Sequence, residues 1–145
     1  MTAKELRVNV RETSSITAED GDVTDLTSLS PGCLRETAAG LVLTYTQDSE
    51  SGKIFNRVET TDHGLRITRS GAVELTLLLE PKRTEKTIYR VPPFSFDMLV
   101  TAEAVKIRRE ESGGLRIGLS FRSVVGGSAQ TTRLVIRATP REEAV

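Results

Sequence analysis

Four polar side chains fall where the hydrophobic alternation of the chain would turn them toward the inside of a sheet: Tyr45, Asn56, Arg69 and Tyr89. Arg69 follows Leu65 and Ile67 at two-residue intervals, and side chains two apart along a strand share a face. A buried guanidinium needs an anionic partner, because an unpaired charge inside a protein costs several kcal/mol or more. A ligand carboxylate or phosphate would serve, bound by Arg69 with help from a tyrosine.

Two other arrangements satisfy Arg69 without a ligand. The guanidinium could pair with an inward-facing Glu or Asp, or a shift of register at Gly71 could turn Arg69 outward, since bulges at glycine are common. We favour these arrangements over ligand binding, and the sequence leaves all three open. Tyr45, Asn56, Arg69 and Tyr89 are therefore the candidate ligand-binding residues.

The residues that carry most enzyme chemistry are scarce in this chain. His63 and Cys33 are its single histidine and single cysteine, whereas a zinc site needs roughly three or four ligands. His63 stands between Asp62 and Gly64 in a predicted turn, and no Gly-x-Ser-x-Gly motif is present. Cys33 can form no intrachain disulfide and is expected to be a small apolar strand residue. We expect no metal site, no cofactor and no enzymatic activity.

The charges of the chain balance, with 20 basic and 20 acidic residues among 145. This balance gives no broad electrostatic reason to bind nucleic acid or an anionic membrane, and with no tryptophan and 4% aromatic residues a stacking platform for bases is not expected. The longest aliphatic runs, among them 77–79, are too short to span a bilayer, and the first residues are not expected to form a secretory signal. A cytoplasmic location is expected, without nucleic-acid or membrane partners.

Period-two alternation of apolar residues runs through most of the chain and predicts strands. The predicted strands cover roughly 6–11, 23–29, 33–37, 41–46, 54–59, 65–69, 73–80, 85–91, 94–111, 115–122 and 132–137. The polar stretches 12–21 and 47–52 are predicted loops, and Pro31-Gly32 is predicted to break the chain between two strands. A corner at Ser70-Gly71 is predicted to join two strands of a hairpin.

Residues 102–111 are the one ambiguous segment. Their Ala, Glu, Lys and Arg content favours a helix. However, Val105 and Ile107 alternate with Lys106 and Arg108, and the residues just before them clearly follow period two. We therefore predict one long strand with a bend near Ala102.

Roughly ten short strands joined by short turns predict an all-β fold. The prediction is a single antiparallel up-and-down barrel of about eight to ten strands, because closing a meander removes exposed edges. One domain is expected over residues 1–145, with an ordered core over about 4–138 and a C-terminal tail over 139–145.

Several segments also resemble a known family. Leu65-Arg-Ile-Thr-Arg-Ser-Gly-Ala-Val73 resembles the Arg-Ser-Gly-Ala-Val core of the YwiB-like bacterial family, and 40–47 is similar to its tyrosine-bearing strand. Residues 52–58 look like its following strand, and 94–105 with 114–121 fit its late hairpin. The resemblance covers most of the chain, from about residue 23 to residue 136.

The resemblance implies a calycin-like (lipocalin-like) β-barrel. The family has no settled activity, so it carries no catalytic or binding residues onto this chain. The helix-prone segment 102–111 departs from the Thr-rich strand that the family would place there.

Two functions follow from this reasoning. The first is a non-enzymatic barrel that binds a small, partly apolar or anionic ligand in its interior. The alternative is a structural or interaction module with a filled barrel that self-associates. Leu78, Val42 and Leu99 lie out of phase with the main apolar set and could form the patch of a homodimer.

Overall fold

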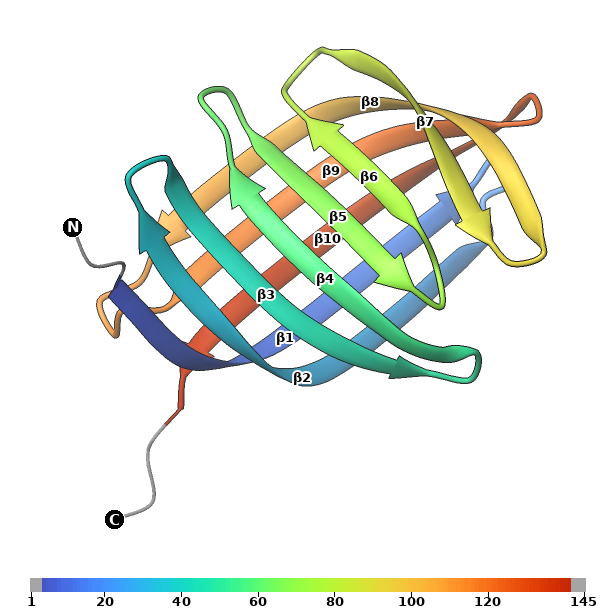
Figure 1. Ribbon diagram of the computed structural model, residues 1–145. Coiled ribbons are helices and arrows are strands. Elements are labelled where there is room, and N and C mark those ends of the chain that lie inside the picture. Colours follow the sequence, from blue (N-terminus) through green and yellow to red (C-terminus); the bar gives the residue numbers. More distant parts are fainter. Residues whose placement is uncertain (1–3, 142–145) are drawn as a thin grey trace.

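The computed structural model describes residues 4–141, and among these it contains ten strands and no helix. The strands are β1 (Lys4–Ala18), β2 (Val23–Thr37), β3 (Gly40–Ser49), β4 (Gly52–Thr60), β5 (Leu65–Gly71), β6 (Leu75–Leu79), β7 (Thr84–Val91), β8 (Phe94–Arg109), β9 (Leu115–Val125) and β10 (Ser128–Pro140). Figure 1 shows them wrapped into a barrel, with β3 to β6 on the near wall and β1, β8, β9 and β10 behind.

The barrel is an antiparallel meander, as predicted. Its strand order is β6-β5-β4-β3-β2-β1-β10-β9-β8-β7, so the ring is cut between β6 and β7. The two cut edges meet through one bridge, in which the backbone N–H groups of Glu74 and Arg90 each donate to the other's carbonyl at 2.9 Å. The Thr87 hydroxyl also donates to the Thr76 carbonyl at 2.7 Å. The barrel is therefore nearly closed, with a seam between β6 and β7.

Alternating apolar side chains fill the inside of the barrel. Val8, Leu43, Ile67, Ile117 and Ile136, each from a different strand, are all at most 1% exposed. They face one another because β-strand side chains alternate between the two faces of the sheet. Burial of such residues stabilises the fold by about 1.5–3 kcal/mol each.

Two predicted loops turn out to belong to strands. β1 continues to Ala18, with Glu12 opposite Ile136 of β10, and β3 continues to Ser49, with Gln47 opposite Ile54. The polar composition of these stretches misled the prediction, because polar inward side chains can stay in a ladder where they bond to one another. Strand β10 likewise runs to Pro140, past the predicted end of the core at 138. Residues 142–145 of the predicted tail lie outside the described residues.

The predicted break at Pro31-Gly32 is wrong. β2 runs through both residues without interruption, and Asn9 of β1 lies opposite Pro31. A proline is tolerated in a strand where its missing N–H faces an open edge.

The corner of the β5–β6 hairpin falls slightly later than predicted. β5 includes Gly71 and β6 begins at Leu75. Gly71 has a φ of +96°, and a Cβ there would collide with the Lys53 carbonyl. The ladder keeps its register up to Arg69, which lies opposite both Asn56 and Leu75, so no bulge turns Arg69 outward.

The ambiguous segment is a strand up to Arg109, as the alternation predicted, and its last two residues, 110 and 111, lie beyond the strand. β8 runs from Phe94 to Arg109, and its register against β9 shifts between Ala102 and Ala104. The bulge at this point is the predicted bend. It lets Met98 and Val100 face the core on one side while Val105 faces it on the other.

Candidate functional site

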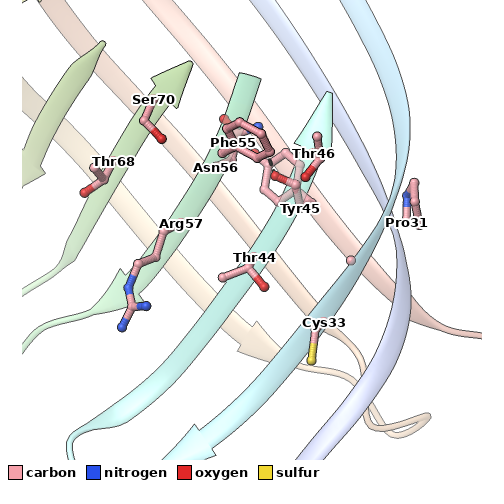
Figure 2. Close-up of a pocket in the computed structure, with 11 residues that line it drawn as sticks. Pro31, Cys33, Thr44, Tyr45, Thr46, Phe55, Asn56, Arg57, Thr68 and Ser70 are labelled. Atoms are coloured by element: carbon pink, nitrogen blue, oxygen red, sulfur yellow. Dashed lines mark hydrogen bonds between the residues drawn. The ribbon is translucent and has the colours of Figure 1, made fainter. Parts of the chain in front are cut away.

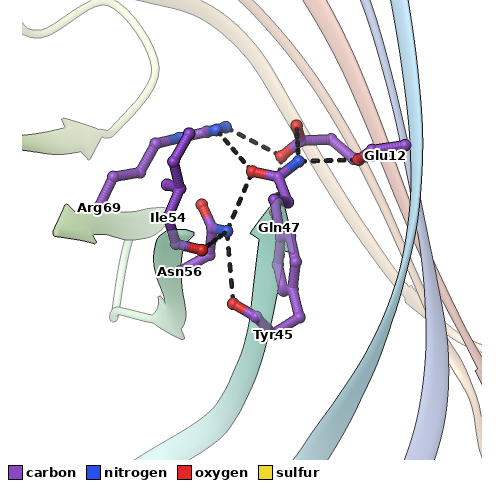
Figure 3. A network of polar contacts seen from close by, with 7 residues as sticks. Glu12, Tyr45, Gln47, Ile54, Asn56 and Arg69 are labelled. Atoms are coloured by element: carbon purple, nitrogen blue, oxygen red, sulfur yellow. Dashed lines mark hydrogen bonds and ion pairs between the residues drawn. The ribbon is translucent and has the colours of Figure 1, made fainter. Parts of the chain in front are cut away.

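A buried polar network lies inside the barrel between β1, β3, β4 and β5 (Figure 3). Arg69 donates from Nη2 to Glu12 Oε1 at 2.9 Å and from Nη1 to Gln47 Oε1 at 3.3 Å. The Tyr45 hydroxyl donates to the same Glu12 oxygen at 2.6 Å. The side chains of Arg69 and Glu12 are only 19% and 10% exposed. The guanidinium is thus paired with a carboxylate inside the protein.

Gln47 connects the members of this network. Its amide Nε2 donates to Glu12 Oε2 and to the Ser28 hydroxyl, both at 2.8 Å. Its Oε1 accepts from Asn56 Nδ2 at 3.1 Å as well as from Arg69. Asn56 is 3% exposed, and its Oδ1 has no hydrogen-bond partner among residues 4–141. The Arg69 guanidinium is therefore held by both Glu12 and Gln47, and the Asn56 Oδ1 atom remains as a buried acceptor without a donor among the described residues.

Tyr45 acts in this network as a proton donor only. Burial raises the pKa of its phenol far above the usual range, and the Glu12 carboxylate raises it further while Arg69 acts in the opposite direction. The hydroxyl therefore stays protonated at any physiological pH and cannot serve as a general base.

Three of the four predicted site residues meet in this network: Tyr45, Asn56 and Arg69. Arg69 faces inward, as the alternation predicted, and it pairs with an inward Glu, which is one of the arrangements weighed from the sequence. Tyr89 does not join them. It lies on β7 opposite Phe96, partly buried against the core.

Glu12 and Gln47 are two members of this network that were not among the predicted site residues. Both were assigned to loops. A signal was present, because Glu12 continues the spacing of Val8 and Val10, and Gln47 continues that of Leu43 and Tyr45. Extending each alternation by one step places both side chains inside the barrel.

A groove opens along the seam between β5–β6 and β7, and it reaches Arg69. Its volume is about 450 Å³, and its lining includes Arg69, Glu74, Leu75, Lys86, Ile88 and Arg90. Arg90 and Glu74 are 3.6 Å apart, with both side chains more than half exposed. Lys86 makes no ion pair within the described chain. Three cations, one carboxylate and two apolar side chains thus line a solvent-open site.

A second groove, of about 410 Å³, lies on the outer face of β2 to β5 (Figure 2). Phe55, 51% exposed, stands there among threonines and Ser70, and Cys33 and Arg57 lie along the same groove. The Cys33 thiol donates to Glu5 Oε1 at 3.0 Å. Burial, and then the Glu5 carboxylate, raise the pKa of this thiol. It is a half-buried strand residue and is not an activated nucleophile.

Other predicted features are placed as follows. His63 is exposed in the turn between β4 and β5. Over residues 4–141, no cluster of three or more His, Cys, Asp or Glu is arranged to hold a metal ion. A search of the same residues for a helix long and apolar enough to cross a membrane finds none. Val42 and Leu78 are half-buried and Leu99 is 48% exposed on β8.

Fold and site together define a small all-β protein, an up-and-down barrel with a polar network in its interior. The sequence profile of a family described as a domain of unknown function (DUF1934) matches residues 8–134, and the chain belongs to that family. The crystal structure of the ywiB protein from Bacillus subtilis has the same fold, with a TM-score of 0.85 and 17% sequence identity over 97% of this chain and 96% of that chain. The resemblance predicted from the sequence is confirmed. A comparison with curated proteins finds no match.

Proposed function

We propose that this protein is a non-enzymatic barrel that binds a small, partly apolar anion in the groove at the β6–β7 seam. The observation that carries the proposal is the groove itself, which reaches the inward-facing Arg69 and is lined by two further cations. The sequence prediction placed the ligand inside the barrel. The proposed site is instead the opening in its wall, because apolar side chains and the Glu12 network occupy the interior beside Arg69.

The charges of the groove favour an anion. Arg69 is neutralised by Glu12, but Lys86 is unpaired within the described residues, and the Arg90–Glu74 pair is exposed on both sides. An exposed ion pair is worth about 0–1 kcal/mol, so a ligand anion can take the place of Glu74 at little cost. Carboxylate and phosphate oxygens would then meet Lys86 and Arg90.

Arg69 would contribute hydrogen-bond donors in a fixed position to this site. Two of its N–H groups are held by Glu12 and Gln47, whereas a guanidinium carries five N–H donors in a planar fork. Because the guanidinium is already fixed, its remaining donors could bind a ligand with little further loss of side-chain entropy. Leu75 and Ile88, which is 44% exposed, would contact the apolar part of the ligand.

The proposal remains non-enzymatic because neither candidate reactive group is poised for reaction. The raised pKa values keep both the Tyr45 phenol and the Cys33 thiol protonated. We keep the cytoplasm as the proposed compartment, where a thiol remains reduced.

Isothermal titration calorimetry with inorganic phosphate, octanoate and octyl phosphate tests the proposal. Octyl phosphate should bind most tightly, because it offers both an anion and an apolar chain. The double variant Lys86→Ala/Arg90→Ala should weaken its binding by roughly a hundredfold, since each hydrogen bond to a charged group contributes about 1.5 kcal/mol or more.

The control is Lys106→Ala, which removes an exposed charge from β8, away from the seam. It should bind octyl phosphate like the wild type. The proposal is wrong if none of the three anions binds, or if the double variant binds octyl phosphate as tightly as the control.

A second candidate function is an interaction module that self-associates. Large apolar side chains on the outside favour it, among them Leu29 at 75% and Phe94 at 64% exposure. Phe94 and Phe96 also stack on each other, with ring centroids 6.3 Å apart. Light scattering over a range of concentrations tests this function, and a monomer at every concentration would contradict it.

A further inference from the structure

The first half of β2 is an open sheet edge. β2 pairs with β1 from Val23 onward, but its pairing with β3 begins only at Gly32. Residues 23–31 therefore have a strand on one side and none on the other. No turn or loop backbone of the described chain bonds to this segment.

Pro31 and Gly32 explain where the two strands part. Thr37 and Gly40 close the two-residue turn between β2 and β3, and the closing pair of such a turn is hydrogen-bonded. From Thr37 back along β2, every second residue would direct its N–H to β3. Residue 31 belongs to this series, but a proline has no N–H to donate. Beyond this point the Gln47 and Ser28 side chains bridge the two strands at 2.8 Å in place of a backbone ladder.

The same count identifies the free backbone groups. Val23, Asp25, Thr27 and Leu29 direct their N–H and C=O groups to the open edge, because alternate residues of an antiparallel strand face alternate sides. Such a row of unpaired groups is a template for another strand. The segment also exposes its apolar side chains: Val23 by 57%, Leu26 by 58% and Leu29 by 75%.

We infer that a second copy of this chain adds to the barrel here, with the two β2 edges pairing antiparallel about a two-fold axis at Leu26. This inference rests on the second proposed function and names its surface. In this register Leu26 lies opposite Leu26, and Val23 lies opposite Leu29. Asp25 faces Thr27, whose hydroxyl can donate to the carboxylate. Each exposed apolar side chain thus gains an apolar partner across the interface.

The edge matches itself better in this register than in the register with its axis at Thr27. An axis at Thr27 would place Val23 opposite Pro31 and Asp25 opposite Leu29, which loses a donor and sets a charge against an apolar group. The axis at Leu26 sets no like charges directly opposite each other, although it makes the two Asp25 carboxylates diagonal neighbours. A chain of formal net charge zero does not repel its copy as a whole. A two-fold dimer is also the commonest closed assembly, because one self-complementary surface suffices.

Disulfide trapping tests the register. In a Cys33→Ser background, Leu26→Cys should form a covalent dimer on mild oxidation, because directly opposite residues of a non-hydrogen-bonded pair lie within disulfide reach. Thr24→Cys alone should form no covalent crosslink under the same conditions, because residue 24 does not lie opposite itself in this register. A mixture of Thr24→Cys and Ser28→Cys chains should crosslink, since these positions lie opposite each other in the proposed register. Leu99→Cys on β8, where Leu99 is 48% exposed against 58% for Leu26, is the control and should not crosslink.

Analytical ultracentrifugation of the unmodified chain and of Thr27→Pro completes the test. Proline at 27 removes an N–H from the open edge and leaves the β1 side intact, so circular dichroism should be unchanged while the dimer dissociates. A dimer that Leu26→Cys fails to trap, or that survives Thr27→Pro, overturns the edge inference and leaves self-association standing. A wild-type chain that stays monomeric overturns both.

Discussion

Replacing Arg69 by methionine tests whether the interior ion pair supports the barrel. The variant leaves the Glu12 carboxylate, 10% exposed, without its cation. Breaking one side of a buried pair costs about 3–5 kcal/mol. Tyr45 and Gln47 still donate to the carboxylate, so we expect a loss near the lower limit, about 3 kcal/mol.

Urea unfolding of a double-mutant cycle measures this effect. Glu12→Gln/Arg69→Met removes both charges and keeps a side chain that can accept from Tyr45. Its free energy of unfolding should exceed the value expected from adding the two single losses by about 1–3 kcal/mol. If Arg69→Met unfolds within about 0.5 kcal/mol of the wild type, or if the two losses simply add, the network does not work as described.

Two further predictions concern Cys33 and Gly71. The Cys33 thiol, with its raised pKa, should react with iodoacetamide at pH 8 more slowly than the cysteine of an unstructured peptide. Glu5→Gln should speed the reaction, because it removes the negative charge that accepts the thiol proton's hydrogen bond. Equal rates in the wild type and in Glu5→Gln would contradict the role given to Glu5. Gly71→Ala should lower the free energy of unfolding by about 1–3 kcal/mol, because of its positive φ and the Lys53 carbonyl. Gly118→Ala, where a Cβ meets no atom within 4 Å, is the matched control, and an equal effect of both substitutions on urea unfolding would refute the explanation.

Alternation alone predicted the class of fold and the inward face of most strands. Alternation also predicted a strand for residues 102–111, although their composition favours a helix. Val105 lies in a ladder and packs against the core, and helix propensity takes no account of such packing. Propensity is a weak signal where tertiary packing decides the structure. The inward position of Arg69 followed from the same two-residue count.

The partners of Arg69 could not be predicted from composition. Glu12 and Gln47 looked like loop residues because polar stretches usually are, and only the closed barrel brings residues 57 positions apart into one ion pair. Pro31 misled for a related reason, since its effect depends on which side of the strand has a neighbour. Tyr89 was placed with the site by its spacing, but spacing fixes a face of the sheet and not the distance to another strand.

The proposed function depends on an anion binding at the β6–β7 seam. Two-dimensional amide NMR of the labelled protein during a titration with octyl phosphate tests it most directly. We expect saturable shifts concentrated at Thr76, Lys86, Thr87 and Ile88, which line the groove. An absence of shifts, or shifts confined to the outer groove around Phe55, would contradict it.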